Sequence, residues 1–179
     1  PYITSYYEDN WGFCMTHDQL LSLKDCKYNV FIDSTLEKGS LTYGELVIPG
    51  ETEEEIFLST YVCHPSMANN EVSGPAVTTF LCKWLEEYKN RRYTYRIVFI
   101  PETIGSITYL SRHLEHLKKY VIAGFNVTCV GDDRTYSYLP SRQGATLSDR
   151  VALHTFKKIY PDFKCYSYLD RGSDERGYC

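Results

Sequence analysis

The sequence lacks an uninterrupted apolar segment of the roughly 18–20 residues that span a bilayer. Its first residues, PYITSYYEDN, also lack the basic region followed by an apolar stretch that marks a secretory signal. Charge of one sign does not accumulate, because 23 acidic and 19 basic residues give a net charge of -4 without a long run of either. Such a chain offers no basic patch to a phosphate backbone. We therefore expect a cytoplasmic protein whose partners include neither a membrane nor a nucleic acid.

The seven cysteines include no CxxC pair, and their number is odd. Most of them lie within apolar runs, so we expect reduced thiols in the core. At 179 residues, with 43% hydrophobic and 23% charged residues, the chain fits one globular domain or one domain with part of a second. It opens on Pro1 and closes on Cys179 directly after RGSDERGY. We expect a fragment of a longer protein.

The first fifty residues differ in pattern from the rest. The segment NVFIDSTLEKGSLTYGELVIPG, residues 29–50, predicts two strands joined by a hairpin turn at Gly39. A boundary follows at Pro49-Gly50 and the acidic stretch ETEEE. We expect residues 1–50 to be part of an inserted β-rich domain outside the main sheet, and residues 51–179 to form an α/β domain truncated at its C-terminus.

Apolar strand candidates alternate with amphipathic helices in the second part. The predicted strands are residues 56–62, 95–100, 121–130 and 163–169. Helical spacing of apolar residues follows Gly74 and Thr103, and Thr146 with Asp149 resembles the capping box of a third helix. This alternation predicts a mainly parallel sheet covered by helices on both faces.

Titratable side chains follow every predicted strand. Since ligands bind beyond the carboxyl ends of parallel strands, we predict that these side chains gather along one sheet edge: His64, Glu102, Asp132 and Asp174. Histidine, glutamate and aspartate are the groups used for metal binding and for acid–base hydrolysis. Purely structural roles are the alternative, because polar residues cap helices and Asp132 can pair with Arg134.

Longer motifs at these positions resemble a known superfamily. They are FLSTYVCHPSMANNEVSGPAVTTFLCKWL (57–85), YRIVFIPETIGSITYL (95–110) and the late RGSDERGY (171–178). Together they resemble the zinc-dependent aminopeptidase and glutamate-carboxypeptidase-like exopeptidases, whose fold is a three-layer α/β sheet. The combination of CHPSMANNE, IPETIGS, CVGDD and DRGSDER is most similar to a group of uncharacterised bacterial aminopeptidase-like proteins associated with surface-polysaccharide biosynthesis.

The resemblance implies roles for individual positions. His64 matches the first metal-binding histidine, and Glu102 matches the general-base glutamate. Asn70 stands where the family has a metal-bridging aspartate, and Thr103 and Thr128 stand where it has further carboxylate ligands. Neutral side chains cannot offset the repulsion between two metal ions. The resemblance therefore implies a single zinc ion, or none, in place of a paired-zinc centre.

Two functions follow from these features. The first is a metal-dependent exopeptidase that hydrolyses an amide in a small peptide or amino-sugar derivative, with Glu102 as general base. Its predicted metal ligands are His64, Asp132 and Asp174, and its predicted substrate contacts are Asn69, Asn70, Arg171 and Arg176. The second is a catalytically inactive module that binds a peptide or saccharide. Cysteine hydrolysis through Cys63 and His64 is disfavoured, because neighbours within a strand face opposite sides.

Overall fold

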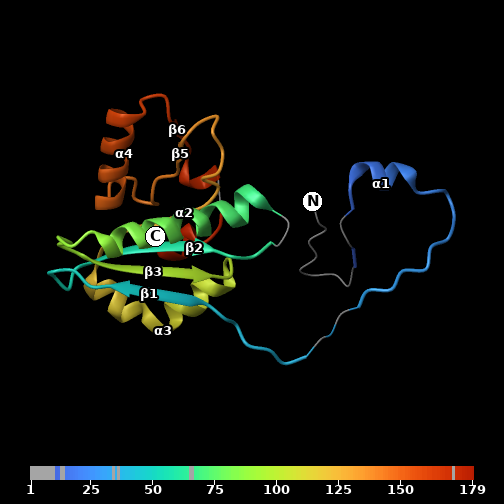
Figure 1. The fold of residues 1–179 in the computed structure, drawn as a ribbon, viewed down its shortest axis with the longest axis horizontal. Helices are drawn as coiled ribbons and strands as arrows, with labels where there is room; N and C mark the ends of the chain where they lie inside the picture. Colours follow the sequence, from blue (N-terminus) through green and yellow to red (C-terminus); the bar gives the residue numbers. More distant parts are fainter. Residues whose placement is uncertain (1–10, 13–14, 34, 36, 65–66, 171) are drawn as a thin grey trace. The chain divides into compact units, whose positions relative to one another are not determined.

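The computed structural model describes residues 11–12, 15–33, 35, 37–64, 67–170 and 172–179. The chain divides into two compact units, Pro1–Lys38 and Gly39–Cys179. Each unit is described by itself, and Figure 1 shows the course of the chain through both. The strands predicted to carry chemistry all lie in the second unit.

The first unit contains one helix among its described residues, α1 (His17–Ser22). Thr16 caps this helix, since its side chain accepts a hydrogen bond from the backbone of Gln19 and the Gln19 side chain returns one. No strand forms at residues 30–33, where the sequence predicts the first arm of a hairpin. Phe31 is 87% exposed there, and an apolar arm without a covering layer gains little by extending. The hairpin prediction is wrong for these described residues.

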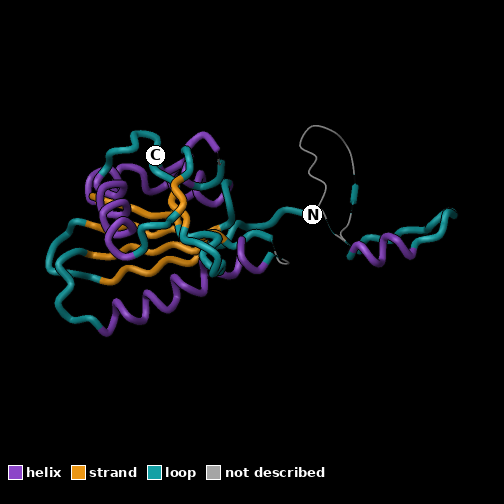
Figure 2. Tube along the Cα trace, turned by 90° about the horizontal axis from the view of Figure 1, so that it is seen from above, coloured by secondary structure: helices purple, strands orange, loops and turns teal. Residues whose placement is uncertain are grey.

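The second unit is built on a four-stranded sheet in the order β1-β3-β2-β4. Its strands are β1 (Gly44–Ile48), β2 (Glu55–Tyr61), β3 (Thr94–Ile100) and β4 (Val121–Asn126). Strand β2 runs parallel to both β3 and β4, whereas β1 is antiparallel to β3 at the edge (Figure 1). Figure 2 shows the strands of the sheet side by side, in orange, with helices alongside them. The prediction of a mainly parallel sheet is confirmed.

The edge strand β1 corrects the domain boundary that we expected near residue 50. All five of its residues pair with β3, although the sequence predicts them outside the sheet. Ile48 is only 4% exposed and packs with Leu58 and Ile97 in one core cluster. Burial of this apolar face outweighs the interruption suggested by the Pro49-Gly50 turn. The two units instead divide after Lys38.

Helices lie on both faces of the sheet. Helix α2 (Ser73–Glu87) contributes Cys82 and Leu85 to one core cluster, and α3 (Ile104–Tyr120) contributes Tyr109 and Leu117 to another (Figure 1). Helix α4 (Leu147–Ile159) packs against β4. The second unit is thus an α/β structure in which helices flank a mainly parallel sheet, as predicted. Among the described helices, none combines the length and apolar character needed to cross a membrane.

The predicted strand at residues 163–169 is wrong as a member of this sheet. Only β6 (Lys164–Cys165) is extended, and it pairs in parallel with β5 (Ser137–Tyr138) in a separate two-stranded sheet. A 3-10 helix, η2 (Tyr168–Asp170), follows. Tyr166 and Leu169 are 49% and 80% exposed. The apolar run therefore lacks the buried face that a central strand requires.

The cysteines do not form a set of core thiols. Cys82 is buried and Cys129 is half-buried, whereas four others are exposed: Cys26, Cys63, Cys165 and Cys179. All six are free thiols. Cys14 lies outside the described residues. Their position in apolar runs was therefore a poor guide to burial, because several of those runs end at the surface.

Helix α4 begins at the predicted capping box. The Thr146 side chain accepts a hydrogen bond from the Asp149 backbone, and the Asp149 carboxylate accepts one from the Thr146 backbone. Asp149 is 1% exposed and also accepts hydrogen bonds from Ser141 and from the Tyr138 hydroxyl. Burial alone would raise the pKa of Asp149, but these hydrogen bonds outweigh it and hold the pKa well below its ordinary 3.8.

Replacing Asp149 with asparagine should lower the free energy of unfolding by about 2 kcal/mol at neutral pH, because several donors lose their acceptor. Since the folded-state pKa is depressed, the carboxylate stabilises the fold above its unfolded value of 3.8, and this contribution is lost as the pH falls below it. Urea titrations should therefore give a smaller difference from wild type at about pH 3 than at about pH 7. The exposed Asp162→Asn is the control. An equal difference at both pH values would refute this linkage.

Candidate metal centre

The candidate site lies where the neighbouring parallel strands β2 and β3 end. The Val62 backbone N–H donates to Ile100 at 2.8 Å, which keeps the chain beside β3 beyond the last residue of β2. His64 follows β2 and Glu102 follows β3, and the His64 Nδ1 and Glu102 Oε2 atoms are 4.0 Å apart. Parallel pairing places both carboxyl ends at one edge of the sheet. The structure thus brings together two of the predicted site residues.

Cys63 joins these two residues to give three possible ligand atoms. Its Sγ, a ring nitrogen of His64 and a carboxylate oxygen of Glu102 all lie within 4.8 Å of one another. Within the described part of the chain, no other group of His, Cys, Asp and Glu side chains comes together in this way. Zinc binds thiolate, imidazole and carboxylate, and its open sites use three protein ligands. The donor set therefore fits one zinc ion.

The strand-alternation argument against cysteine hydrolysis does not hold, because Cys63 and His64 lie beyond Tyr61, where β2 ends. Electrostatics disfavours it instead. Although Cys63 is exposed as a residue, partial desolvation of its thiol raises the pKa of that thiol, and the nearby carboxylates of Glu71 and Glu102 raise it further. An activated nucleophile needs a depressed pKa, so a free Cys63 is poorly suited to attack a carbonyl.

Glu71 is a site residue that sequence reasoning missed. It lies on a π-helical segment, η1 (Ala68–Val72), and is 4% exposed. One carboxylate oxygen accepts a hydrogen bond from the Cys63 backbone N–H at 2.6 Å, and the other lies 2.9 Å from His64 Nδ1. A signal was available, because Glu71 is the one acidic residue between His64 and Leu85. The Glu71 carboxylate therefore orients both Cys63 and His64.

Residues from the C-terminal segment complete the surroundings of Glu102. The Ser173 hydroxyl donates to Glu102 Oε1 at 2.5 Å. Asp174 is fully buried, and its Oδ1 accepts hydrogen bonds from the Thr103 backbone at 2.6 Å and from Ser106 at 3.0 Å. Burial raises the pKa of Asp174 to about 6, against the effect of these hydrogen bonds. Ser173 thus contacts Glu102, whereas Asp174, predicted as a metal ligand, lies outside the group of three ligand atoms and holds the start of α3.

The chain is similar to known proteins over nearly its whole length. Residues 11–179 match the family model described as "Domain of unknown function (DUF4910)". The chain belongs to this family. A curated relative from Clostridium acetobutylicum, "Putative polysaccharide biosynthesis protein with aminopeptidase-like domain", is 47% identical over 176 residues, which cover 98% of this chain and 40% of the relative.

The chain is also similar to a solved structure. The crystal structure of a "putative peptidase" from Clostridium acetobutylicum matches with a TM-score of 0.89 and 46% identity, over 99% of this chain and 42% of that one. The DUF4910 chain therefore spans about two fifths of the length of the relatives it matches. Both matched proteins carry peptidase-type names, in agreement with the resemblance seen in the motifs of this chain.

Asp132 lies outside the group of three ligand atoms in this DUF4910 chain. Its carboxylate accepts hydrogen bonds from the backbone and the guanidinium of Arg134. These hydrogen bonds, from the side chain first and then from the backbone, lower the pKa of Asp132 to about 2. The structural alternative, a pair with Arg134, describes this residue.

The predicted substrate contacts occupy different environments. Asn69 Oδ1 accepts a hydrogen bond from the Gly131 backbone at 2.8 Å, so this side chain ties the loop after β4 to η1. Asn70 Oδ1 is buried, and among the described residues no hydrogen-bond partner reaches it. Arg176 is exposed, with its guanidinium 6.0 Å from the centre of the Tyr168 ring. Arg171 lies outside the described residues.

Proposed function

We propose that this DUF4910 chain carries the site of a metal-dependent, exopeptidase-like hydrolase, with His64 as ligand of a single zinc ion and Glu102 as general base. The observation that carries the proposal is the 4.0 Å approach of Glu102 Oε2 to the His64 ring at the carboxyl ends of β2 and β3. A metal ligand and a base must meet around one water molecule for hydrolysis. The peptidase and aminopeptidase-like names of the relatives support the same chemistry.

In this proposal Glu102 moves the proton. Zinc, when bound, supplies Lewis-acid polarisation of the amide carbonyl and lowers the pKa of water. Ser173 holds Glu102 Oε1, so that Oε2 stays turned toward His64. Glu102 accepts a proton from the attacking water and returns it to the leaving amine. Asp174 supports this geometry by holding the Thr103 backbone, the residue next to the base.

The proposed substrate is a small peptide or an amino-sugar derivative. Both classes contain an amide bond next to polar groups, and the curated relative is named for an aminopeptidase-like domain and for polysaccharide biosynthesis. Asn70 and Arg176 are the described residues proposed to contact such a substrate, one through a buried amide and one through an exposed guanidinium. The three-layer exopeptidase arrangement is part of the same proposal.

A catalytically inactive module that binds a peptide or saccharide is the second candidate. Thr128, at a position where the exopeptidases have a carboxylate ligand, directs its hydroxyl to the Tyr61 hydroxyl at 2.5 Å. Asn70 and Thr103 likewise bring no negative charge to the site. Loss of three carboxylates is the observation that favours this alternative, because it weakens any metal site of the family type.

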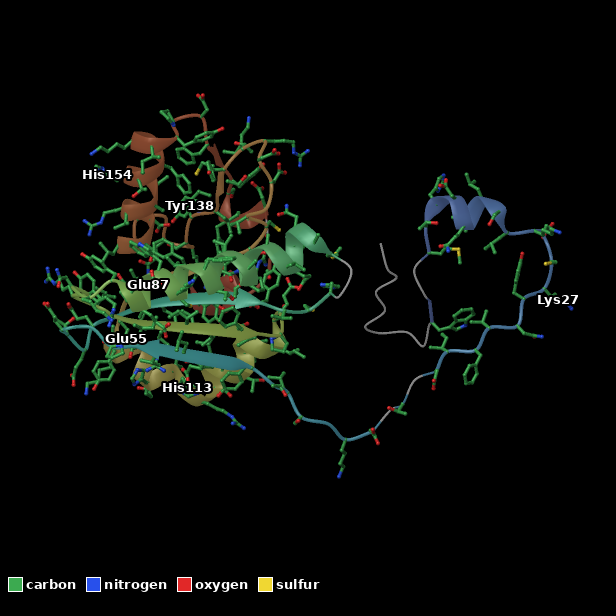
Figure 3. All side chains as sticks on the ribbon, in the orientation of Figure 1. Lys27, Glu55, Glu87, His113, Tyr138 and His154 are labelled. Carbon is green, nitrogen blue, oxygen red and sulfur yellow. The ribbon has the colours of Figure 1, made fainter. Side chains whose placement is uncertain are left out.

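Metal analysis separates the two candidates. The protein purified without chelators should hold about one equivalent of zinc, and His64→Ala should lose most of it because the imidazole ligand is gone. His154→Ala, on the exposed surface of α4 (Figure 3), is the matched control and should keep the metal. Assays on aminoacyl amides and N-acetylated amino sugars should show turnover that a chelator abolishes. Equal metal content in wild type and His64→Ala, or no metal in either, would refute the hydrolase proposal.

A further inference from the structure

We propose that the Cys63 thiolate is the charged ligand that replaces the missing carboxylates of this site, and that Glu71 positions both Cys63 and His64 to bind the ion. The inference rests on the proposed function, which requires a metal ion at His64. It adds a sulfur ligand and a positioning carboxylate that the family resemblance does not imply. The resulting site is mononuclear, with a sulfur donor from Cys63 and a nitrogen donor from His64 beside the Glu102 carboxylate that acts as the base.

The acids predicted to bind a metal do not supply the charge that an ion at His64 needs. Neither Asp174 nor Asp132 belongs to the group of three ligand atoms: Asp174 Oδ1 holds the start of α3, and Asp132 pairs with Arg134. A divalent cation beside a neutral imidazole needs negative ligands to repay its loss of water. The Cys63 Sγ atom lies within 4.8 Å of a ring nitrogen of His64 and supplies such a ligand, which leaves the carboxylate of Glu102 to act as the base.

Two hydrogen bonds fix the backbone around Cys63 and so favour its use as a ligand. The residue before it is held to β3 by the hydrogen bond from Val62 to Ile100, 2.8 Å long. The Cys63 N–H itself is held by Glu71 at 2.6 Å. Because the segment is already ordered, metal binding does not have to order it, and this pre-organisation favours affinity. The thiol proton passes to water as the sulfur–metal bond forms.

Glu71 also contacts the ring of His64. Glu71 Oε1 lies 2.9 Å from Nδ1, and the Glu71 side chain is almost completely buried. A carboxylate at one ring nitrogen holds the proton there and directs the lone pair to the other nitrogen, as in carboxylate–histidine–metal arrangements. One buried side chain thus orients two adjacent ligands, which gives a role to the one acid of an otherwise neutral segment.

Cobalt substitution tests this assignment in the protein purified without chelators. Wild type loaded with Co²⁺ should show a near-ultraviolet thiolate-to-cobalt charge-transfer band, which only a sulfur ligand produces. Cys63→Ser should lose the band and lower metal affinity by at least about 100-fold. Glu71→Gln should keep the band but lower affinity by about 10–100-fold, the cost typical of removing an outer partner of a ligand. The exposed Cys165→Ser is the matched control and should retain both.

Alkylation provides an independent measurement in the unmutated protein. Zinc should protect Cys63 from iodoacetamide and leave Cys165 reactive, with both sites read by mass spectrometry. A protein that binds cobalt through His64 without the charge-transfer band would overturn this inference and leave the proposed function standing. A protein that binds no metal would overturn both. Wild-type affinity in Glu71→Gln would remove the positioning role of Glu71.

Discussion

Replacing Glu102 with glutamine should lower kcat/KM for amide hydrolysis by about 10²–10⁴-fold, the range typical of a lost general base. Glutamine keeps the shape of the side chain and an oxygen that can lie near the ion, but it cannot accept a proton. Zinc occupancy at saturating metal should therefore stay high while turnover falls. The measurement pairs steady-state kinetics, on the substrate that wild type cleaves fastest, with metal analysis of the same sample.

Glu115→Gln provides the matched control for this variant. Glu115 lies on α3, and its side chain is 90% exposed, so the same chemical change there should leave turnover unaltered. Ser173→Ala should give a smaller loss than Glu102→Gln, because Ser173 orients the carboxylate without taking the proton. Unchanged kcat/KM in Glu102→Gln would show that another group accepts the proton.

A large loss of stability is expected from a change at the opposite end of β2, where charged side chains surround the buried Glu55. Arg96 binds Glu55 through two nitrogens, at 2.7 and 2.9 Å, and binds Glu45 on β1 at 2.6 Å. Glu55 begins β2 and is 4% exposed (Figure 3). Burial alone would raise the pKa of Glu55, but hydrogen bonds from Arg96 and His116 outweigh it and lower the pKa. The guanidinium thus neutralises two carboxylates at the base of the sheet.

Replacing Arg96 with methionine should lower the free energy of unfolding by about 3–5 kcal/mol, because the buried Glu55 carboxylate loses its guanidinium partner and keeps only His116. Thermal and urea denaturation at neutral pH measure this loss. The double variant Arg96→Met with Glu55→Gln should recover part of it, since the uncompensated charge is gone even though a hydrogen bond is also lost. This recovery distinguishes a charge effect from a packing effect.

Arg112→Ala, an exposed position on α3, is the control for the loss of an arginine and should change stability by less than about 0.5 kcal/mol. An Arg96→Met variant that loses less than about 1 kcal/mol would mean that solvent screens the cluster as it does a surface ion pair. Glu45 also accepts a hydrogen bond from the buried Tyr109 hydroxyl, at 2.5 Å. This shared oxygen ties β1 to both β3 and α3, and it helps to explain why the edge strand belongs to the sheet.

Local patterns in the sequence predicted much of the second unit, Gly39–Cys179, correctly. The apolar runs that became β2 and β3 end in His64 and Glu102, and the rule that parallel strands finish at one edge was enough to bring these residues together. The capping box at Thr146 likewise predicted the start of α4. These features depend on neighbours in the chain or on a single strand pairing, so the sequence carries them directly.

Features that depend on distant contacts could not be predicted in the same way. The edge strand β1 was expected outside the sheet, and the run at 163–169 was expected inside it, because both have strand-like composition. Helix α2 shows the same limit, since its apolar stripe leaves Phe80 75% exposed and Trp84 58% exposed. Composition indicates what can be buried, whereas the available covering layer decides what is buried.

The sequence by itself determined the alternation of strands and helices, the polar residues that follow each strand, and the neutral side chains at three positions where the resemblance to exopeptidases implies acids. Only the tertiary structure decided which of these residues share a site. It brought Cys63 and Glu71 to His64, and it paired Asp132 with Arg134 away from the three ligand atoms. The reason is physical: residue type fixes the chemistry a side chain can perform, but the distances over which ligands and charges act are set by backbone pairing between distant segments.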